Sequence, residues 1–324
     1  MEIEAREEVW PLKETFRISR GSRTETRVIV VTIHDAGKLG RGEAVPIRRY
    51  QQTSDSVLSQ IELIKREKNF DRQRLQDLLP PGAARNALDC AFWDLEAKRS
   101  GKRVWELANI RSAAEIETSF TISLDSPDRM GAAAKSASKL PILKLKLGGD
   151  DVDLSRVEAV HKEAPKTRLF VDANESWSAK HYQNVTPKLK ALGVEVIEQP
   201  FPADADHVLE TLDHPVPVCA DESSHTTADL PQLKKRYEMI NVKLDKTGGL
   251  TEALRLCQHA REHGFKLLIG CMVGTSLSMA PARVLASIAD YVDLDGPLLL
   301  VHDRDNGLTY QNGKIGLPSR DLWG

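Results

Sequence analysis

The sequence has few of the features expected of a secreted or membrane-inserted protein. Its 324 residues include only four cysteines, and these have no paired spacing (Cys90, Cys219, Cys257 and Cys271). No apolar run reaches the roughly 18 residues that a transmembrane helix needs, and residues 1–6 form no apolar signal region. We therefore expect reduced cysteines in the core and a cytoplasmic protein.

The sequence also lacks an excess of charge of either sign. Lysine and arginine number 45 against 47 aspartate and glutamate residues, and no basic stretch is interleaved with aromatic residues. We therefore expect a small-molecule substrate and neither a nucleic acid nor a membrane as partner. Assembly into a homo-oligomer is compatible with this composition. A hydrophobic content of 41% in a chain of this length suffices for a barrel and a smaller second domain.

A strand with an unusual pattern is predicted at residues 140–148. Lys144 and Lys146 alternate with leucines and share one strand face. If the leucines face packed helices, the lysines point into an interior, where their charge requires anionic partners. The alternative is an exposed edge strand whose lysines prevent aggregation. The segments that follow favour the interior.

After Lys146, six short apolar runs end in charged or small residues at intervals of 22–28 residues. The run ends are Asp172, Glu198, Asp221, Lys243, Cys271 and Asp295. Each interval fits one strand, one loop and one crossover helix, which predicts parallel strands in a barrel or in an open doubly wound sheet. With residues 118–124 as the first strand, eight strands are available, and eight close a barrel.

The fold class expected is therefore α/β. The specific form is a modified TIM barrel, (β/α)7β, with an N-terminal α+β capping domain that the C-terminal tail completes. We place the capping domain at residues 1–114, with helices predicted at 54–65, 71–79 and 83–99. The barrel takes residues 115–298, and residues 299–324 pack back on the capping domain.

Three acidic residues end adjacent predicted strands: Asp172, Glu198 and Asp221. Active sites of parallel barrels lie at these carboxyl ends. A ligand set of oxygen atoms alone favours a hard divalent ion, Mg²⁺ first and Mn²⁺ second. The alternative is that the three acids cap helices or form salt bridges.

Two of the predicted strands that carry lysines lie opposite each other in an eight-stranded barrel. Lys146 and Lys243 would then face the two sides of one bound carbon atom. One neutral lysine would remove the α-proton and the other would return a proton from behind, which inverts the centre through an enolate. The metal and Lys144 would stabilise the enolate and lower the pKa of the basic lysine.

Two further groups of residues suggest contacts with substrate. Asp293 and Asp295 share a face of the last strand and have no obvious local cation, which suits a ligand ammonium group, with a salt bridge to a lysine or arginine as the alternative. Arg20 and Arg23 lie in an early polar loop that either ends a solvated hairpin or holds an anionic group over the site.

Several motifs together resemble the muconate lactonizing subgroup of the enolase superfamily. They are Lys144-x-Lys146, Val171-Asp172-Ala173-Asn174, Glu198-Gln199-Pro200, Ala220-Asp221-Glu222-Ser223 and Asn241-Val242-Lys243. The segment 241–250 and Asp293-Leu294-Asp295-Gly296 are similar to the dipeptide epimerases, in particular the bacterial L-Ala-D/L-Glu epimerases. The resemblance implies a metal on the three acids, acid/base lysines at Lys146 and Lys243, an ammonium site at Asp293 and Asp295, and pairing of Arg23 with the glutamate side chain.

The leading functional hypothesis is an isomerase, a Mg²⁺-dependent epimerase of L-Ala-L-Glu and L-Ala-D-Glu. The resemblance alone implies the biological setting, which is the breakdown of cell-wall peptides. The alternatives within the superfamily are a lyase similar to o-succinylbenzoate synthase and an N-acylamino acid racemase, whose substrates lack the ammonium group. Two further alternatives are a Schiff-base aldolase barrel, outside the metal enzymes, that uses one lysine, and a non-catalytic binding or structural protein on this fold.

Three local patterns are weighed and set aside. His259 and His263 fit an inverted zinc-protease motif but fall on a helix outside the barrel. Gly248-Gly249 could cradle phosphate, although we expect these glycines to let the backbone approach the substrate. Lys246 could compete with Lys243 but is expected in a loop.

Overall fold

The computed structural model describes residues 1–67 and 70–324. Its N-terminal part is an antiparallel sheet of order β1-β2-β3 covered by helices. The strands are β1 (Glu2–Ile18), β2 (Gly21–Asp35) and β3 (Lys38–Ala44); the helices are η1 (Arg48–Tyr50), α1 (Ser54–Ile64), α2 (Arg72–Leu78), α3 (Ala83–Ser100) and α4 (Val104–Leu107). The predicted helices of this part are confirmed to within one or two residues.

The second part is a nearly closed barrel of eight parallel strands in the order β12-β11-β10-β9-β8-β7-β6-β5. Its strands are β5 (Phe120–Ile122), β6 (Ile142–Lys146), β7 (Arg168–Asp172), β8 (Val194–Glu198), β9 (Val218–Ala220), β10 (Met239–Val242), β11 (Lys266–Gly270) and β12 (Tyr291–Asp293). Between the first and last strands, the Ser119 N–H donates to Val292 O at 2.9 Å. The predicted barrel is confirmed.

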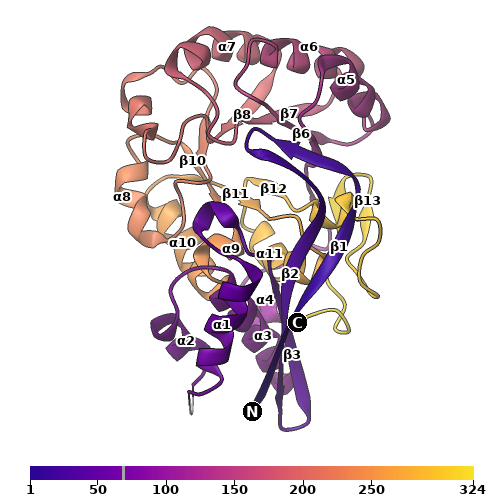
Figure 1. Cartoon of the computed structure of the whole chain (residues 1–324), viewed down its shortest axis with the longest axis vertical. Helices are drawn as coiled ribbons and strands as arrows, with labels where there is room; N and C mark the ends of the chain where they lie inside the picture. The colour runs from indigo at the N-terminus through magenta and orange to yellow at the C-terminus, as the bar shows by residue number, and fades with distance from the viewer. Residues whose placement is uncertain (68–69) are drawn as a thin grey trace.

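Helices connect the strands and cover the outside of the barrel (Figure 1). They are α5 (Pro127–Ser136), α6 (Asp153–Glu163), α7 (Ala179–Ala191), η2 (Asp206–Thr211), η3 (Thr227–Asp229), α8 (Leu230–Leu233), α9 (Leu244–Thr247), α10 (Leu250–Glu262), α11 (Ser276–Ala286) and η4 (Gly296–Leu299). A small antiparallel sheet joins β4 (Ile116–Glu117), β13 (Tyr310–Gln311) and β14 (Lys314–Ile315). No helix in the described residues is long and apolar enough to cross a membrane.

Strand β6 shows how the barrel separates an apolar layer from a charged interior. Leu143 and Leu145 belong to the main core between strands and helices, whereas Ile142 belongs to a small cluster inside the barrel. Because side chains alternate along a strand, Lys144 and Lys146 share the inner face with Ile142, and both are buried. The predicted interior position of the lysines is confirmed, and the edge-strand alternative is wrong.

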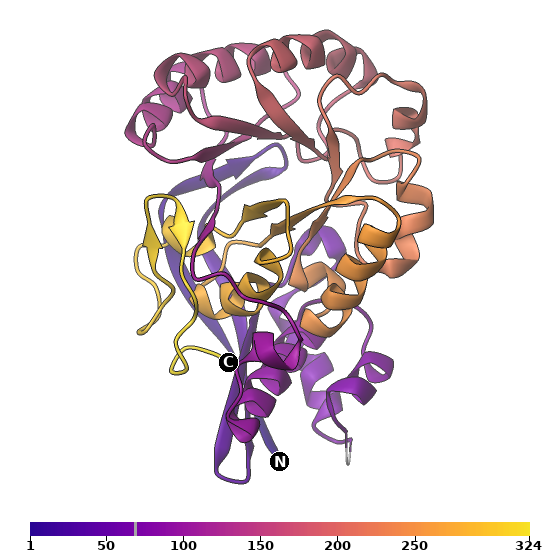
Figure 2. The same ribbon diagram turned by 180° about the vertical axis from the view of Figure 1, so that it is seen from behind.

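The capping helix α3 is tied to the barrel by buried hydrogen bonds. Asp89 accepts the Thr251 N–H at 3.0 Å at the start of α10. The Asn86 side chain donates to Asp245 at 2.9 Å, and Arg85 donates to Thr247 O at 2.6 Å. Figures 1 and 2 show the β1–β2 hairpin reaching from this helical end to the barrel mouth.

The C-terminal residues lie against the same helix α3. The Trp323 indole N–H donates to Cys90 O at 3.1 Å, and the Gly324 N–H donates to Asp94 at 2.7 Å. Trp323 is completely buried, so this indole contributes a large apolar surface to the packing. In Figure 2 the yellow tail runs back to helices of the N-terminal part.

Candidate active site at the barrel mouth

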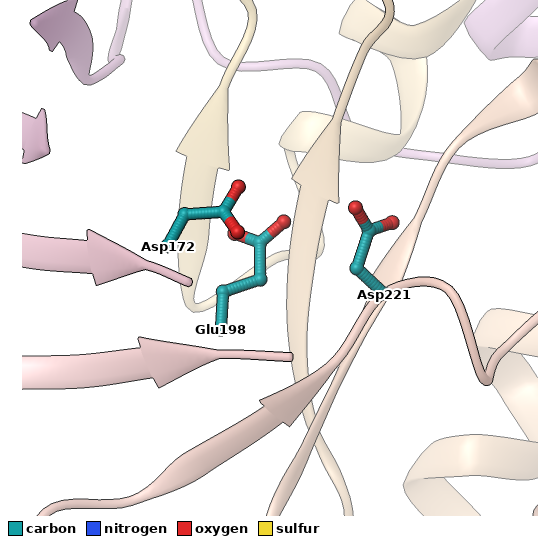
Figure 3. Close-up of side chains that lie close together, drawn as sticks. All are labelled: Asp172, Glu198 and Asp221. Atoms are coloured by element: carbon teal, nitrogen blue, oxygen red, sulfur yellow. The ribbon is translucent and has the colours of Figure 1, made fainter. Parts of the chain in front are cut away.

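Three carboxylates from adjacent strands converge at one point of the barrel mouth (Figure 3). Asp172 ends β7, Glu198 ends β8, and Asp221 directly follows β9. One oxygen of each lies within 4.8 Å of the others, and all three residues are buried. The structure thus brings together the three side chains that the spacing of the sequence placed at adjacent strand ends.

The electrostatics of this triad favour a bound cation. Burial, together with the neighbouring Asp172 and Asp221, raises the pKa of Glu198 to about 8. Three carboxylates that repel one another in a buried site need positive charge, and an all-oxygen donor set suits Mg²⁺. The residues present therefore fit a magnesium ion held by Asp172, Glu198 and Asp221.

Lys146 and Lys243 lie on two sides of the triad. The Lys146 Nζ is 2.6 Å from Asp172 Oδ2, and the Lys243 Nζ is 2.6 Å from Asp221 Oδ2. Both lysines line one cavity of about 610 Å³ at the barrel mouth. Four strand positions separate β6 from β10 in the barrel order, so the two amines approach this cavity from opposite walls.

The pKa of Lys243 departs from its ordinary value in the direction opposite to that expected. Burial and Lys144 lower it, but the carboxylates of Asp221 and Glu198 outweigh them and raise the pKa. A divalent cation on the same carboxylates would neutralise that negative charge. The expected decrease therefore depends on the metal, since Lys144 by itself does not produce it.

Lys144 lies deeper in the barrel than the other two lysines and contacts three carboxylates. Its Nζ is 2.7 Å from Glu198 Oε2, 2.6 Å from Asp293 Oδ2 and 3.4 Å from Asp172 Oδ2. Its side chain is 1% exposed. Lys144 therefore joins the triad to the far wall of the barrel.

Sequence reasoning missed two residues that hold the triad. Asn241 donates from Nδ2 to Glu198 Oε1 at 2.9 Å, and Lys246 places its Nζ 2.7 Å from Asp221 Oδ1. Lys246 lies on helix α9 and is buried, so its predicted loop position is wrong: the chain turns directly into a helix after β10. Asn241 lies on β10 two residues before Lys243, which directly follows the strand, and this alternation was the available signal.

The aspartates of the last strand have partners within the protein. Asp293 accepts from Ser119 Oγ at 2.6 Å in addition to Lys144, and Asp295 accepts the Thr121 N–H at 2.6 Å. The premise that Asp293 has no local cation is therefore wrong, because the barrel brings Lys144 to it. Asp295 lies beyond the end of β12, where the chain turns into η4, and not on the strand as expected. Neither residue is among those that line the described cavity.

The two arginines of the β1–β2 hairpin differ in their partners. Arg20 pairs with Glu222 at 2.6 Å and with Glu175 at 3.0 Å. Arg23 lines the cavity and lies over the Phe16 ring at 5.5 Å, with no carboxylate in ion-pair distance among the residues described. Burial lowers the pKa of Arg23. Arg23 is therefore the hairpin arginine with capacity for an external anion.

Two patterns set aside above have structural roles away from the site. His259 lies on the exposed side of α10 and His263 directly follows the helix; their Nδ1 atoms contact backbone carbonyls of the preceding turn. Gly248 and Gly249 have positive φ, and a Cβ on either would collide with residues of the N-terminal part. The expectation that these glycines face the substrate is wrong; they allow helix α3 to approach.

Family models match both parts of the chain. The N-terminal domain model of mandelate racemase and muconate lactonizing enzyme matches residues 1–108, and the enolase C-terminal domain-like model matches residues 129–321. The chain belongs to the mandelate racemase/muconate lactonizing enzyme family of the enolase superfamily. The family resemblance predicted from the motifs is confirmed.

Two relatives in this family have similar sequences along nearly their whole length. The L-Ala-D/L-Glu epimerase of Escherichia coli (strain K12) is 45% identical over 318 residues, covering 96% of this chain and 98% of that protein. An N-acetyl-D-glutamate racemase of Pseudoalteromonas sp. is 44% identical over 301 residues, covering 92% and 95%. Both are isomerases that act on amino acid derivatives.

Solved structures of family members have the same fold. An enolase family member from Agrobacterium tumefaciens with homology to dipeptide epimerases, bound to sodium and L-Ala-L-Glu, has a TM-score of 0.97 at 45% identity and covers 99% of each chain. A dipeptide epimerase from Methylococcus capsulatus with Mg and L-Arg-D-Lys has a TM-score of 0.89 at 30% identity, covering 98% of this chain and 97% of that one.

Proposed function

We propose that this protein is a Mg²⁺-dependent epimerase that inverts the α-carbon of the second residue of a dipeptide. The observation that carries the proposal is the placement of Lys146 and Lys243 on opposite walls of one cavity. Each amine contacts a different carboxylate of the triad, at 2.6 Å. Proton transfer to and from opposite faces of one carbon requires two such groups.

The chain's own residues divide the steps of the proposed reaction. One lysine, in its neutral form, takes the α-proton, and the other, in its protonated form, donates a proton to the opposite face; the roles exchange for the other stereoisomer. Bound Mg²⁺ would supply positive charge for the substrate carboxylate as the enolate develops. Lys144 holds Glu198 in position and adds positive charge to the site.

The substrate proposed is L-Ala-L-Glu together with L-Ala-D-Glu. Two cavity-lining arginines, Arg23 and Arg48, have no carboxylate partner in the described residues; Arg48 is exposed, whereas Arg23 is half-buried, which suits the glutamate side chain. The resemblance to an L-Ala-D/L-Glu epimerase and to a structure that holds L-Ala-L-Glu supports this choice. In this proposal the cap, formed by residues 1–114 and 299–324, selects the substrate side chain, and residues 115–298 form the catalytic barrel. Asp293 and Asp295 receive the ammonium group of the dipeptide.

A second candidate is the racemisation of N-acylated glutamate. The observation that favours it is the pairing of Asp293 with Lys144 at 2.6 Å, which leaves this carboxylate less available for an ammonium group. The similarity to an N-acetyl-D-glutamate racemase points the same way. Both candidates use the same metal ligands and lysines, so the substrate amine is what distinguishes them.

Proton NMR in D₂O tests the proposal. With Mg²⁺, the glutamate α-proton signal of L-Ala-L-Glu should disappear while L-Ala-D-Glu accumulates, and EDTA should stop both changes. Faster exchange of N-acetyl-L-glutamate than of the dipeptide would favour the second candidate. No exchange of either compound with metal bound would contradict both, and trapping of a substrate by borohydride would favour a Schiff-base aldolase.

A further inference from the structure

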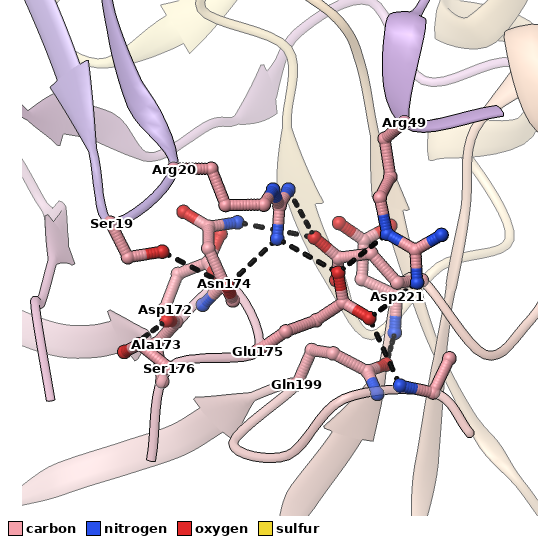
Figure 4. A network of polar contacts seen from close by, with 12 residues as sticks. Ser19, Arg20, Arg49, Asp172, Ala173, Asn174, Glu175, Ser176, Gln199 and Asp221 are labelled. Atoms are coloured by element: carbon pink, nitrogen blue, oxygen red, sulfur yellow. Dashed lines mark hydrogen bonds and ion pairs between the residues drawn. The ribbon is translucent and has the colours of Figure 1, made fainter. Parts of the chain in front are cut away.

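A single carboxylate at the barrel mouth joins two separate segments of the N-terminal part. Glu175 accepts Arg49 in two parallel bonds, from Nε at 2.8 Å and from Nη2 at 2.8 Å. The same carboxylate accepts Arg20 Nη1 at 3.0 Å. Arg20 lies at the hairpin between β1 and β2, whereas Arg49 lies on η1, so Glu175 draws two distant segments to one point (Figure 4).

The hairpin is fastened to the neighbouring residues of the barrel as well. Ser19 Oγ and Arg20 Nη1 both donate to Asn174 O, at 3.0 and 2.7 Å. Arg20 Nη2 donates to Glu222 Oε1 at 2.6 Å. These contacts define a clasp of five residues, Arg20, Arg49, Asn174, Glu175 and Glu222, which holds the rim of the cap on the barrel.

Glu175 is rigidly presented to both arginines. Its φ of 69° lies in the left-handed region, and its N–H donates to Gln199 O at 2.9 Å. Its Oε1 also accepts the Ala203 N–H at 2.9 Å, and the side chain is only 7% exposed. A strained backbone residue that is held this firmly indicates a positional requirement. Glu175 is not among the residues that line the cavity, so its role is indirect.

The clasp carries the residues that face the substrate cavity. Arg23 follows Arg20 by three residues, Tyr50 directly follows Arg49, and both line the cavity. The cap is anchored independently at its other end, where α3 meets the barrel through Asp89 and Arg85. Loss of the clasp should therefore release the rim without separating the two parts of the protein.

We propose that Glu175 is a positioning residue that fixes Arg23 and Tyr50 over the cavity by pairing with Arg20 and Arg49 together. The consequence for catalysis rests on the proposed function, because it assumes that Arg23 receives the substrate side chain. The consequence for the order of the two segments, residues 19–23 and 47–51, does not rest on the proposed function. The two consequences can be measured separately.

Hydrogen–deuterium exchange tests the structural consequence with the full-length chain. In Glu175→Gln, amides of residues 19–23 and 47–51 should exchange about tenfold faster than in the wild type, while those of helix α3 stay unchanged. Glu195→Gln is the matched control, because Glu195 binds Arg168 in the same two-bond geometry at the opposite end of the barrel. Unchanged exchange at both segments, or equal acceleration along the whole chain, would overturn the proposal.

Steady-state kinetics with L-Ala-L-Glu test the catalytic consequence. Glu175→Gln should raise KM about tenfold and leave kcat within about twofold, since the clasp changes the population of the competent rim and not the reacting groups. Glu175→Asp, which keeps the charge, should recover part of the loss, and Glu195→Gln should behave as wild type. A fall in kcat with unchanged KM would overturn the positioning role. If the wild type shows no activity on dipeptides, the proposed function fails, and the exchange experiment still decides the clasp.

Discussion

The Lys144 Nζ lies 2.6 Å from Asp293 Oδ2 and 2.7 Å from Glu198 Oε2, so one buried amine connects the carboxylate triad to the last strand of the barrel. Asp293 and Glu198 are therefore coupled through a shared cation. Lys144 outweighs the effect of burial and lowers the pKa of Asp293, which keeps this carboxylate ionised. Removing Asp293 should consequently affect both the proposed ammonium site and the position of Lys144.

We predict that Asp293→Asn distinguishes these two effects. The loss of an ionic partner for the substrate amine should lower kcat/KM for L-Ala-L-Glu about tenfold more than kcat/KM for N-acetyl-L-glutamate, which has no ammonium group. The measurement is α-proton exchange of each compound at saturating Mg²⁺. Asp290→Asn is the control, since Asp290 binds Arg261 away from the mouth. An equal fall for both compounds would mean that Asp293 acts only through Lys144.

Arg23→Gln should abolish the preference for a glutamate side chain. The Arg23 guanidinium is the half-buried anion partner of the cavity, whereas Arg48 is exposed. The kcat/KM for L-Ala-L-Glu should therefore fall about tenfold or more, while that for L-Ala-L-Gln changes little. Competition between the two dipeptides measures the preference directly. Arg6→Gln, which changes an arginine of β1 that pairs with Glu8, should leave it intact. An unchanged preference in Arg23→Gln would remove Arg23 from substrate selection.

The buried carboxyl of Asp89 should make stability depend on pH. Burial raises its pKa from 3.8 to about 6, although the hydrogen bond from Thr251 acts in the opposite direction and lowers it. Because the folded-state pKa is the higher one, the folded protein holds an extra proton between these values. The contribution of this proton to the free energy of unfolding is complete below pH 4 and is lost as the pH rises through about 6. The loss is on the order of 2–3 kcal/mol.

Thermal unfolding of Asp89→Asn between pH 4 and 7 measures this contribution. The amide is a neutral isostere. Gln76 donates from Nε2 to Asp89 Oδ1 at 3.0 Å, and its buried Oε1 has no partner in the described residues, so a turn of the Gln76 amide lets Oε1 receive the asparagine N–H. Asp245 and Asp295 also have pKa values raised to about 6, so only the difference between variant and wild type isolates Asp89. The Tm of the variant should fall less with rising pH. Parallel Tm profiles would contradict the assignment.

The strand-end residues of the barrel could be predicted from the sequence because a local rule places them. Alternation sends Lys144 and Lys146 to one face, and parallel strands bring Asp172 and Glu198 to one edge. Neither inference requires knowledge of how the loops fold. The spacing of the runs fixed the number of strands, and the number of strands placed Lys243 opposite Lys146.

The partners of these residues could not be predicted in the same way. Lys144 and Asp293 meet only because the barrel closes where Ser119, just before β5, donates to Val292 of β12, and no local pattern records that contact. Glu175 lies in a loop and Arg49 on the single turn of η1, 126 residues apart, where no periodicity determines side-chain direction. The prediction that Gly248 and Gly249 let the backbone approach the substrate was wrong. A glycine in a sequence indicates a close approach but does not show which group approaches, here residues of the N-terminal part.

The two-lysine account is tested most directly by following α-proton exchange of each stereoisomer in D₂O with Lys146→Ala and Lys243→Ala. Each variant should lose epimerisation by about a thousandfold or more. One variant should still exchange the α-proton of L-Ala-L-Glu and the other that of L-Ala-D-Glu, because each retains the lysine that faces one side of the carbon. Lys190→Ala, a change on the outer helix α7, is the control. Epimerisation at the wild-type rate in either variant would contradict the account.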